Sequence, residues 1–100
     1  MNKKVRLSPL AKNDLLDILE YLVNKWRAKT ANNFLNIFEE DLKRIAAQPK
    51  QFPHFRKDLN ISKCVVTKHN TLYFRESIFQ IEVVRIYDVR QHPNKLKFKL

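Results

Sequence analysis

The chain has 100 residues, of which 44% are hydrophobic and 11% aromatic, enough for one folded domain with a modest core. Its 20 Lys and Arg residues against 10 Asp and Glu give a formal charge of +10, which favours an anionic partner: nucleic acid, an acidic protein segment or an acidic membrane surface. Glycine is absent, which excludes the glycine-rich loops that hold nucleotide phosphates, so we expect no cofactor.

A short strand followed by a helix is predicted at the start of the chain. Residues 5–7 form a brief apolar and basic run that fits a strand. Ser8 and Pro9 then mark a helix start, because serine is a favoured N-cap and proline fits the first helical turn. We expect this helix to end at Lys25 or Trp26. Apolar residues at helical spacing form its expected buried stripe: Leu15, Leu16, Ile18, Leu19, Leu22, Val23 and Trp26.

A second helix is predicted from residue 28 or 31 to Ala47, because its apolar residues repeat with the same spacing. These residues are Ala31, Phe34, Leu35, Phe38, Leu42 and Ile45. The break between the helices is short, so we expect them to form an antiparallel hairpin. In the first helix, Asp14, Asp17 and Glu20 are expected on the solvent side, away from the apolar stripe.

Three antiparallel strands are predicted in the second half of the chain, after a loop at residues 48–60. They span residues 61–67, 71–75 and 78–89. A polar break at Glu76 and Ser77 makes the last two strands a hairpin. The last run has apolar residues at both alternating positions. This pattern indicates either a central strand covered on both faces or a bulge that swaps the faces.

The order of these elements predicts an α+β fold in a single domain at residues 1–100. It consists of a short N-terminal strand, an antiparallel two-helix hairpin and a three-stranded antiparallel sheet, with the first strand beside the last. The helices can cover only one face of the sheet. The other face should show apolar side chains of the long strand ringed by Lys and Arg, which is typical of a protein-binding surface. An amphipathic, acidic partner segment would fit it.

Several classes of protein and site are not expected. Cys64 is the only cysteine, so no intramolecular disulfide can form and a reducing cytoplasm is the expected location. No apolar run approaches the roughly 18 residues that a membrane span needs, so we expect no membrane association. His54, His69 and His92 lack ligand spacing, so no metal site is predicted.

Five cations fall on or beside the late strands and are the candidate binding residues: Lys63, Lys68, Arg75, Arg85 and Arg90. They can form a basic patch for an anionic partner, or a solvated edge where Lys prevents aggregation. Arg85 interrupts the longest apolar strand, where an unpaired charge is costly. Its candidate partners are Glu82, Asp88 or an acidic residue of another protein. His92, near Arg90, fits either a general acid or base or a solvent-exposed histidine.

Three stretches carry a family resemblance. Residues 7–15 read Leu-Ser-Pro-Leu-Ala-Lys-Asn-Asp-Leu, residues 52–53 read Phe-Pro, and residues 81–93 form a strand that ends in Arg-Gln-His-Pro. In this order and over nearly the whole chain, they resemble the ParE/RelE superfamily of toxins from bacterial type II toxin–antitoxin modules. In that family, a strand leads into Ser-Pro-x-Ala-x-x-Asp-Leu, Phe-Pro follows the second helix, and Arg-x-x-Pro closes the last strand.

The resemblance implies two helices packed on a small antiparallel sheet. It also implies a hetero-oligomer with a cognate antitoxin, which wraps a helix and an extended segment around the toxin. Two activities occur in the superfamily. ParE-like members act on DNA gyrase and block replication, whereas RelE-like members cut messenger RNA on the ribosome.

The closing motif of this chain favours the ParE-like branch and a toxin that is not an enzyme. RNA cleavage without a metal needs a base for the 2′-hydroxyl, an acid for the leaving oxygen and cations for the phosphate. Where RelE-like enzymes have an Arg in a middle strand, this chain has Thr71. Gln91 follows the closing Arg, and Lys97 stands where a Tyr is expected. We therefore predict DNA gyrase as the target.

Two alternatives remain open from the sequence. The first is a ribosome-dependent, metal-independent endoribonuclease in which Arg90 and His92 hold and protonate the scissile phosphate. The second is a basic nucleic-acid-binding module. Its stacking aromatics would be Tyr73, Phe74 and Phe79, although their alternation also fits core packing.

Overall fold

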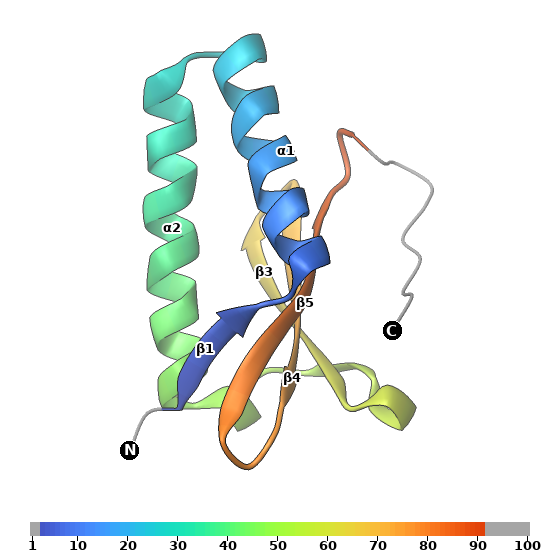
Figure 1. Cartoon of the computed structure of the whole chain (residues 1–100). Coiled ribbons are helices and arrows are strands. Elements are labelled where there is room, and N and C mark those ends of the chain that lie inside the picture. Colours follow the sequence, from blue (N-terminus) through green and yellow to red (C-terminus); the bar gives the residue numbers. More distant parts are fainter. Residues whose placement is uncertain (1–2, 92–100) are drawn as a thin grey trace.

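The computed structural model describes residues 3–91, in which two helices pack against one face of a five-stranded sheet (Figure 1). The helices are α1 (Pro9–Lys25) and α2 (Ala28–Ala47), close to the predicted boundaries. The strands are β1 (Lys4–Leu7), β2 (His54–Arg56), β3 (Ile61–Thr67), β4 (Asn70–Glu76) and β5 (Gln80–Asp88). Two short 3-10 turns, η1 (Pro49–Gln51) and η2 (Lys57–Leu59), flank β2.

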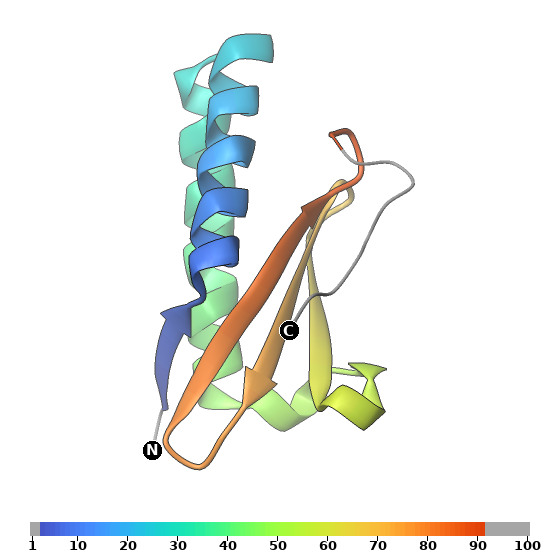
Figure 2. The same cartoon turned by 45° about the vertical axis from the view of Figure 1, so that its right-hand side comes forward.

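The sheet has the order β1-β5-β4-β3-β2. β1 lies parallel to β5, and the other neighbours are antiparallel. Figure 2 shows the helical hairpin standing over one side of this twisted sheet and extending beyond its end. The α+β fold and the place of the first strand beside the last are therefore as predicted. Neither helix in the described part of the chain is long and apolar enough to cross a membrane.

α1 begins as the sequence predicts, because the Ser8 side chain accepts a hydrogen bond from the Ala11 backbone N–H at 3.0 Å. However, the sequence predicts more buried residues on α1 than the structure has. Three of the seven predicted residues lie largely in solvent: Leu16 (63% exposed), Val23 (47%) and Trp26 (65%). The sheet and α2 cover only part of the α1 circumference, and the tip of the helical hairpin projects past the sheet (Figure 1).

The core lies between the helices and the sheet. α2 contributes buried residues that include Phe34 and Phe38, whose rings stack with centroids 6.1 Å apart. They pack in one cluster with Leu72 and Phe74 of β4 and Ile81 of β5. Burying an aliphatic or aromatic side chain of this size stabilises a fold by roughly 1.5–3 kcal/mol, so this layer holds the helices on the sheet.

The prediction that residues 48–60 form a loop without a strand is wrong. β2 pairs with the start of β3, with His54 opposite Ser62. It is only three residues long, too short to show an alternating pattern. The Phe-Pro motif just before it has a packing role, because the Phe52 ring lies edge-on to Phe74 with centroids 5.7 Å apart.

A β-bulge in β5 accounts for its apolar residues at both alternating positions. Tyr73 of β4 lies opposite Arg85, but the next residue, Phe74, lies opposite Val83, which leaves Val84 as the extra residue. The bulge turns Val84 to the face away from the helices, which is one of the two alternatives that the sequence pattern left open. Ser8 completes the bulge: its N–H donates to the Val83 carbonyl and its hydroxyl to the Val84 carbonyl, both at 2.9 Å.

Candidate functional site

The sheet face opposite the helices, here called the open face, is the first candidate site. A small buried cluster of Ile61, Tyr73 and Val84 lies on this side. Phe55 of β2 packs edge-on against Tyr73, with centroids 4.7 Å apart. Val65 of β3 is 63% exposed. The open face is therefore apolar at its centre and only partly covered by its own chain.

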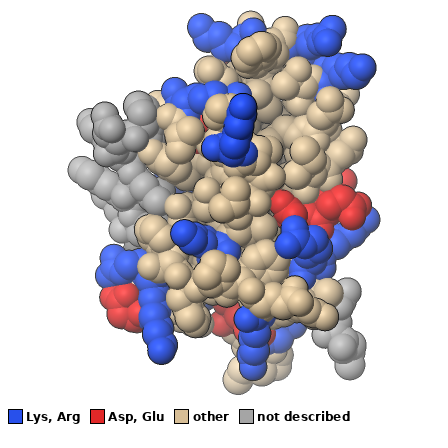
Figure 3. Space-filling view, turned by 180° about the vertical axis from the view of Figure 1, so that it is seen from behind, with Lys and Arg blue, Asp and Glu red and all other residues tan. Residues whose placement is uncertain are grey.

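Cations surround this apolar centre. In the strand register, Lys63 lies beside Tyr73, and Glu82 lies between Arg6 and Arg75. Arg6 pairs with Glu82 at 2.6 Å. In Figure 3, which views the molecule from behind, Lys and Arg side chains are spread over a largely uncharged surface with few acidic groups. Cations therefore lie beside the apolar centre of this face.

Arg75 and Lys63 are the predicted cations that belong to the open face. The Arg75 Nε atom is buried and has no hydrogen-bond partner within residues 3–91. Lys63 forms no ion pair with another described side chain. Both are only partly exposed, so their stems rest on the sheet. Lys68 is exposed in the turn between β3 and β4.

Arg85 is held within the molecule. Its Nε and Nη2 atoms donate to the Asp14 carboxylate of α1 at 2.8 and 3.0 Å, and Asp14 also accepts the Ile86 backbone N–H at 3.0 Å. This charge-assisted bond raises the pKa of Arg85. Of its expected partners, Glu82 pairs with Arg6 and Asp88 with Arg90. Asp14 was predicted to face solvent, but it faces β5. The pairing of β1 with β5 ends at Leu7, opposite Val83, so α1 covers the edge of β5 beyond Val83.

Arg90 is also paired within the chain. Its backbone N–H and its Nε donate to one oxygen of Asp88, at 2.8 and 3.2 Å, and its guanidinium lies over the Tyr21 ring at 5.1 Å from the centroid. The Asp88 side chain is 1% exposed. Arg90 therefore neutralises a buried carboxylate and links the end of β5 to α1.

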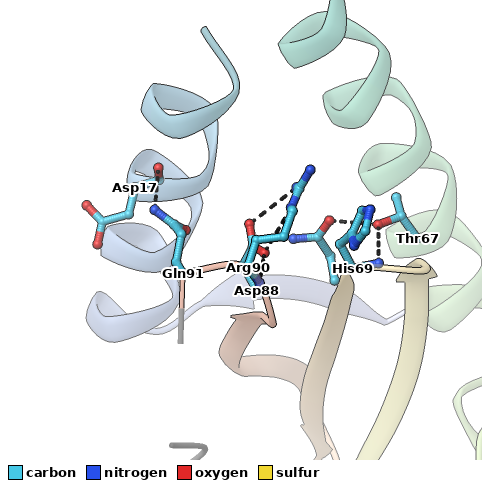
Figure 4. Close-up of polar contacts among 7 residues, drawn as sticks. Asp17, Thr67, His69, Asp88, Arg90 and Gln91 are labelled. Carbon is cyan, nitrogen blue, oxygen red and sulfur yellow. Dashed lines mark hydrogen bonds and ion pairs between the residues drawn. The ribbon is translucent and has the colours of Figure 1, made fainter. Parts of the chain in front are cut away.

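Figure 4 shows the polar cluster around this pair, where the β3–β4 turn meets the end of β5. Thr67 Oγ1 donates to the Asn70 Oδ1 atom at 2.7 Å and accepts the His69 N–H at 3.1 Å. Gln91 Nε2 donates to the Asp17 carbonyl at 3.4 Å. These bonds position backbone segments. They do not align an acid and a base around a free space, as a phosphoryl-transfer site requires.

The other candidate catalytic and metal-binding residues do not form a site within residues 3–91. No group of three or more His, Cys, Asp or Glu side chains is arranged there to hold a metal ion. Burial, with the nearby charge of Asp41, raises the pKa of Cys64 to about 11, so its thiol stays protonated at neutral pH. His92, which the ribonuclease alternative uses, and Lys97, which stands where that branch has a Tyr, lie outside the described residues. Phe74 is in the core, so it cannot stack on a base.

Three partners of charged residues were not predicted from the sequence: Asp14, Tyr21 and Arg6. Asp14 borders the apolar stripe of α1, and that position was a signal that it could face the sheet. The pairing of Arg6 with Glu82 follows from the parallel register of β1 and β5, which no local pattern reveals.

Comparison with known families identifies the class of protein. The profile of the family described as "ParE toxin of type II toxin-antitoxin system, parDE" matches residues 5–93. The chain therefore belongs to the ParE toxin family of type II toxin–antitoxin systems.

A solved structure agrees with this assignment at the level of the fold. A chain from the "Chromosomal ParDE TA system from P. aeruginosa" superposes with a TM-score of 0.74 at 16% sequence identity. The match covers 86% of this chain and 95% of that chain. No curated protein matches the sequence. At this identity the likeness concerns the fold alone, so the target and the binding residues rest on the chain itself.

Proposed function

We propose that this protein is a cytoplasmic toxin that arrests growth by poisoning DNA gyrase and that a cognate antitoxin neutralises it by covering the open face. The membership of the ParE toxin family, over residues 5–93, is the observation that carries the proposal. The antitoxin is the expected partner of such a toxin, in a hetero-oligomer of the two proteins.

The chemistry of the open face supports an amphipathic, acidic antitoxin segment. Apolar side chains of such a segment would cover Val65 and Phe55, which are 63% and 38% exposed. Its carboxylates would reach Lys63 and the part of the Arg75 side chain that is exposed. Both cations are partly buried, so an ion pair formed with them on binding is screened less by solvent than an ion pair between fully exposed side chains.

The pairing of the arginines supports a gyrase poison over a ribonuclease. A ribonuclease of the RelE kind needs cations that are free to bind the scissile phosphate. Arg85 is committed to Asp14, and Arg90 to Asp88 and Tyr21. Thr71 stands in the middle strand where that branch has an Arg. The described residues therefore supply little of the machinery for RNA cleavage.

The test is a gyrase assay with the purified chain, free of antitoxin. We expect it to inhibit supercoiling or to trap cleaved DNA, and the absence of any effect at stoichiometric excess would contradict the gyrase assignment. Induction of the chain alone in cells should arrest growth. New 5′ ends on messenger RNA within minutes of that arrest would instead favour the ribonuclease alternative.

The antitoxin surface is tested by charge reversal at one residue. Lys63→Glu should weaken antitoxin binding and leave gyrase inhibition measurable. Lys12→Glu is the matched control, because Lys12 is an exposed lysine of α1, away from the open face. Equal effects of the two variants would show that only total charge matters and would remove the open face from the proposal.

A further inference from the structure

The tip of the helical hairpin, residues 25–29, combines the only tryptophan of the chain with a cluster of cations. Trp26 ends α1 and is 65% exposed. Lys25, Arg27 and Lys29 are also exposed. A tryptophan side chain normally buries most of its large apolar surface, so its position here is unusual for a residue with only a structural role.

Residues 21–38, which surround the hairpin tip in the sequence, contain no acidic residue, although Lys25 lines one surface hollow together with Asp17 and Glu20. The nearest acid along α1 is Glu20, and the first acid of α2 is Glu39. Lys25, Arg27 and Lys29 form no ion pair with the side chains that the structure describes. The C-terminus of α1 and the N-terminus of α2 meet at the tip, so their opposite helix-dipole charges offset each other and the positive field comes from the three side chains.

The hairpin tip is sterically accessible. Figures 1 and 2 both show the connection between α1 and α2 beyond the end of the sheet, away from the β4–β5 hairpin. Figure 3 shows basic side chains gathered at this same end of the molecule. A ligand can therefore reach the indole and the cations from several directions.

We propose that the hairpin tip binds single-stranded nucleic acid, with Trp26 stacked on an unpaired base and the three cations on adjacent phosphates. Aromatic side chains beside a basic surface are the means by which proteins bind single strands without reading sequence. The proposal does not rest on the toxin function or on the open face.

The composition of the tip favours this ligand over the other polyanions. Interfacial membrane binding needs a broad apolar face, whereas three of the five residues here are charged and only Trp26 is large and apolar. An acidic protein segment would satisfy the cations but would leave the exposed indole without a flat partner. A base with its flanking phosphates satisfies both.

The indole of Trp26 provides a direct probe, because no other tryptophan contributes to the fluorescence of the full chain. Titration with a single-stranded oligothymidylate at low salt should give saturable quenching. With three phosphate contacts, the logarithm of the binding constant should fall with the logarithm of salt at a slope of about −2. No quenching at low salt would overturn the proposal.

Variants test the phosphate contacts of the cations separately from the stacking of Trp26 on a base. Lys25→Ala and Lys29→Ala should each reduce the salt slope by about 0.7. Lys12→Ala, which removes an exposed lysine about 20 Å away along α1, should leave the slope unchanged. Equal effects of all three substitutions would show non-specific attraction and would contradict a site at the tip.

Trp26→Leu tests stacking, with binding followed by anisotropy of a labelled oligonucleotide. We expect affinity to fall about tenfold with an unchanged salt slope, and a loss below twofold would contradict base stacking. Circular dichroism should show the helix content of the wild type, since the indole is largely exposed.

The choice of ligand is tested with matched polyanions. An oligoribonucleotide of the same length is compared with the oligodeoxyribonucleotide. Tighter binding of either one supports the proposal, and the tighter ligand shows whether the site prefers RNA or DNA. Heparin that binds as tightly as the oligonucleotides would overturn it. A blue shift of Trp26 emission with phosphatidylserine vesicles, at concentrations where oligonucleotides give no quenching, would also overturn it in favour of a membrane.

Discussion

Two basic regions of this protein have opposite electrostatic surroundings. At the seam between α1 and β5, Arg85 is paired with Asp14, and their side chains are only 28% and 14% exposed. At the hairpin tip, Lys25, Arg27 and Lys29 are exposed, and none forms an ion pair with a described side chain. The difference teaches that the number of cations does not identify the binding residues. Cations at the seam hold the fold, and those at the tip are free to bind.

The largest effect should come from removing the acid at the seam. Asp14→Ala leaves the Arg85 guanidinium and the Ile86 N–H without their acceptor, so we expect the free energy of unfolding to fall by about 3 kcal/mol. Urea denaturation measures this value. Asp14→Asn, which keeps one acceptor oxygen, should lose less.

The control for the seam is Lys12→Ala on the exposed side of the same helix, with an expected change within about 0.5 kcal/mol. If Asp14→Ala cost no more than this control, the seam would be an ordinary surface ion pair. The seam and the hairpin tip would then not differ in how much their charged residues stabilise the fold.

A smaller loss is expected at the end of β5. Arg90→Ala removes the cation over Tyr21 and leaves the buried carboxylate of Asp88 with only its backbone donor, so unfolding should become easier by about 2 kcal/mol. Thermal and urea unfolding of the variant would measure this loss. Arg90→Met keeps the apolar stem and should recover the part that comes from packing.

Arg90 also provides a check on function. If Arg90→Ala abolished gyrase inhibition while remaining folded, Arg90 would contact the target as well as Asp88. If it lost inhibition only in proportion to the unfolded fraction, its role would be confined to the fold.

Next in size is the serine that joins α1 to the bulge of β5. Ser8→Ala removes the N-cap bond to Ala11 and the bond to the Val84 carbonyl, and we expect a loss of about 1 kcal/mol. Chemical denaturation of Ser8→Thr should show most of that stability restored, because threonine keeps the hydroxyl. Equal losses for both variants would mean that side-chain fit, and not hydrogen bonding, matters at this position.

Much of the fold followed from local signals in the sequence. Ser8 and Pro9 mark the start of α1, and the apolar residues at both alternating positions of the last strand indicated either a central strand or a bulge, of which the structure shows a bulge at Val84. β2 escaped prediction because a three-residue strand is defined by its pairing with β3 and not by its own pattern. Ile78 and Phe79 were assigned to the last strand by their type, but they lie in the turn before β5, 82% and 85% exposed.

The candidate sites were less predictable than the fold, because each depends on contacts between distant segments. From helical spacing we expected Asp14 on the solvent side of α1, but the end of β1 at Leu7 exposes the β5 edge that Asp14 faces. Trp26 continues the stripe of α1 in sequence. It is exposed because the hairpin is longer than the sheet beneath it, and the relative lengths of packed elements cannot be read from periodicity.

The smallest expected effect lies at the hairpin tip, where neutralisation should cost almost no stability. A Lys25→Ala and Lys29→Ala double variant should unfold within about 0.5 kcal/mol of the wild type, because both side chains are exposed and their mutual repulsion is removed. Urea denaturation at low and high salt is the measurement. If the repulsion is real, the wild type should gain more stability from salt than the variant does. A loss above 1 kcal/mol would mean that the tip, like the seam, uses its cations to hold the fold together. An unchanged stability combined with weaker oligonucleotide binding would separate the two regions by function, since only charges that the fold does not need are available to a ligand.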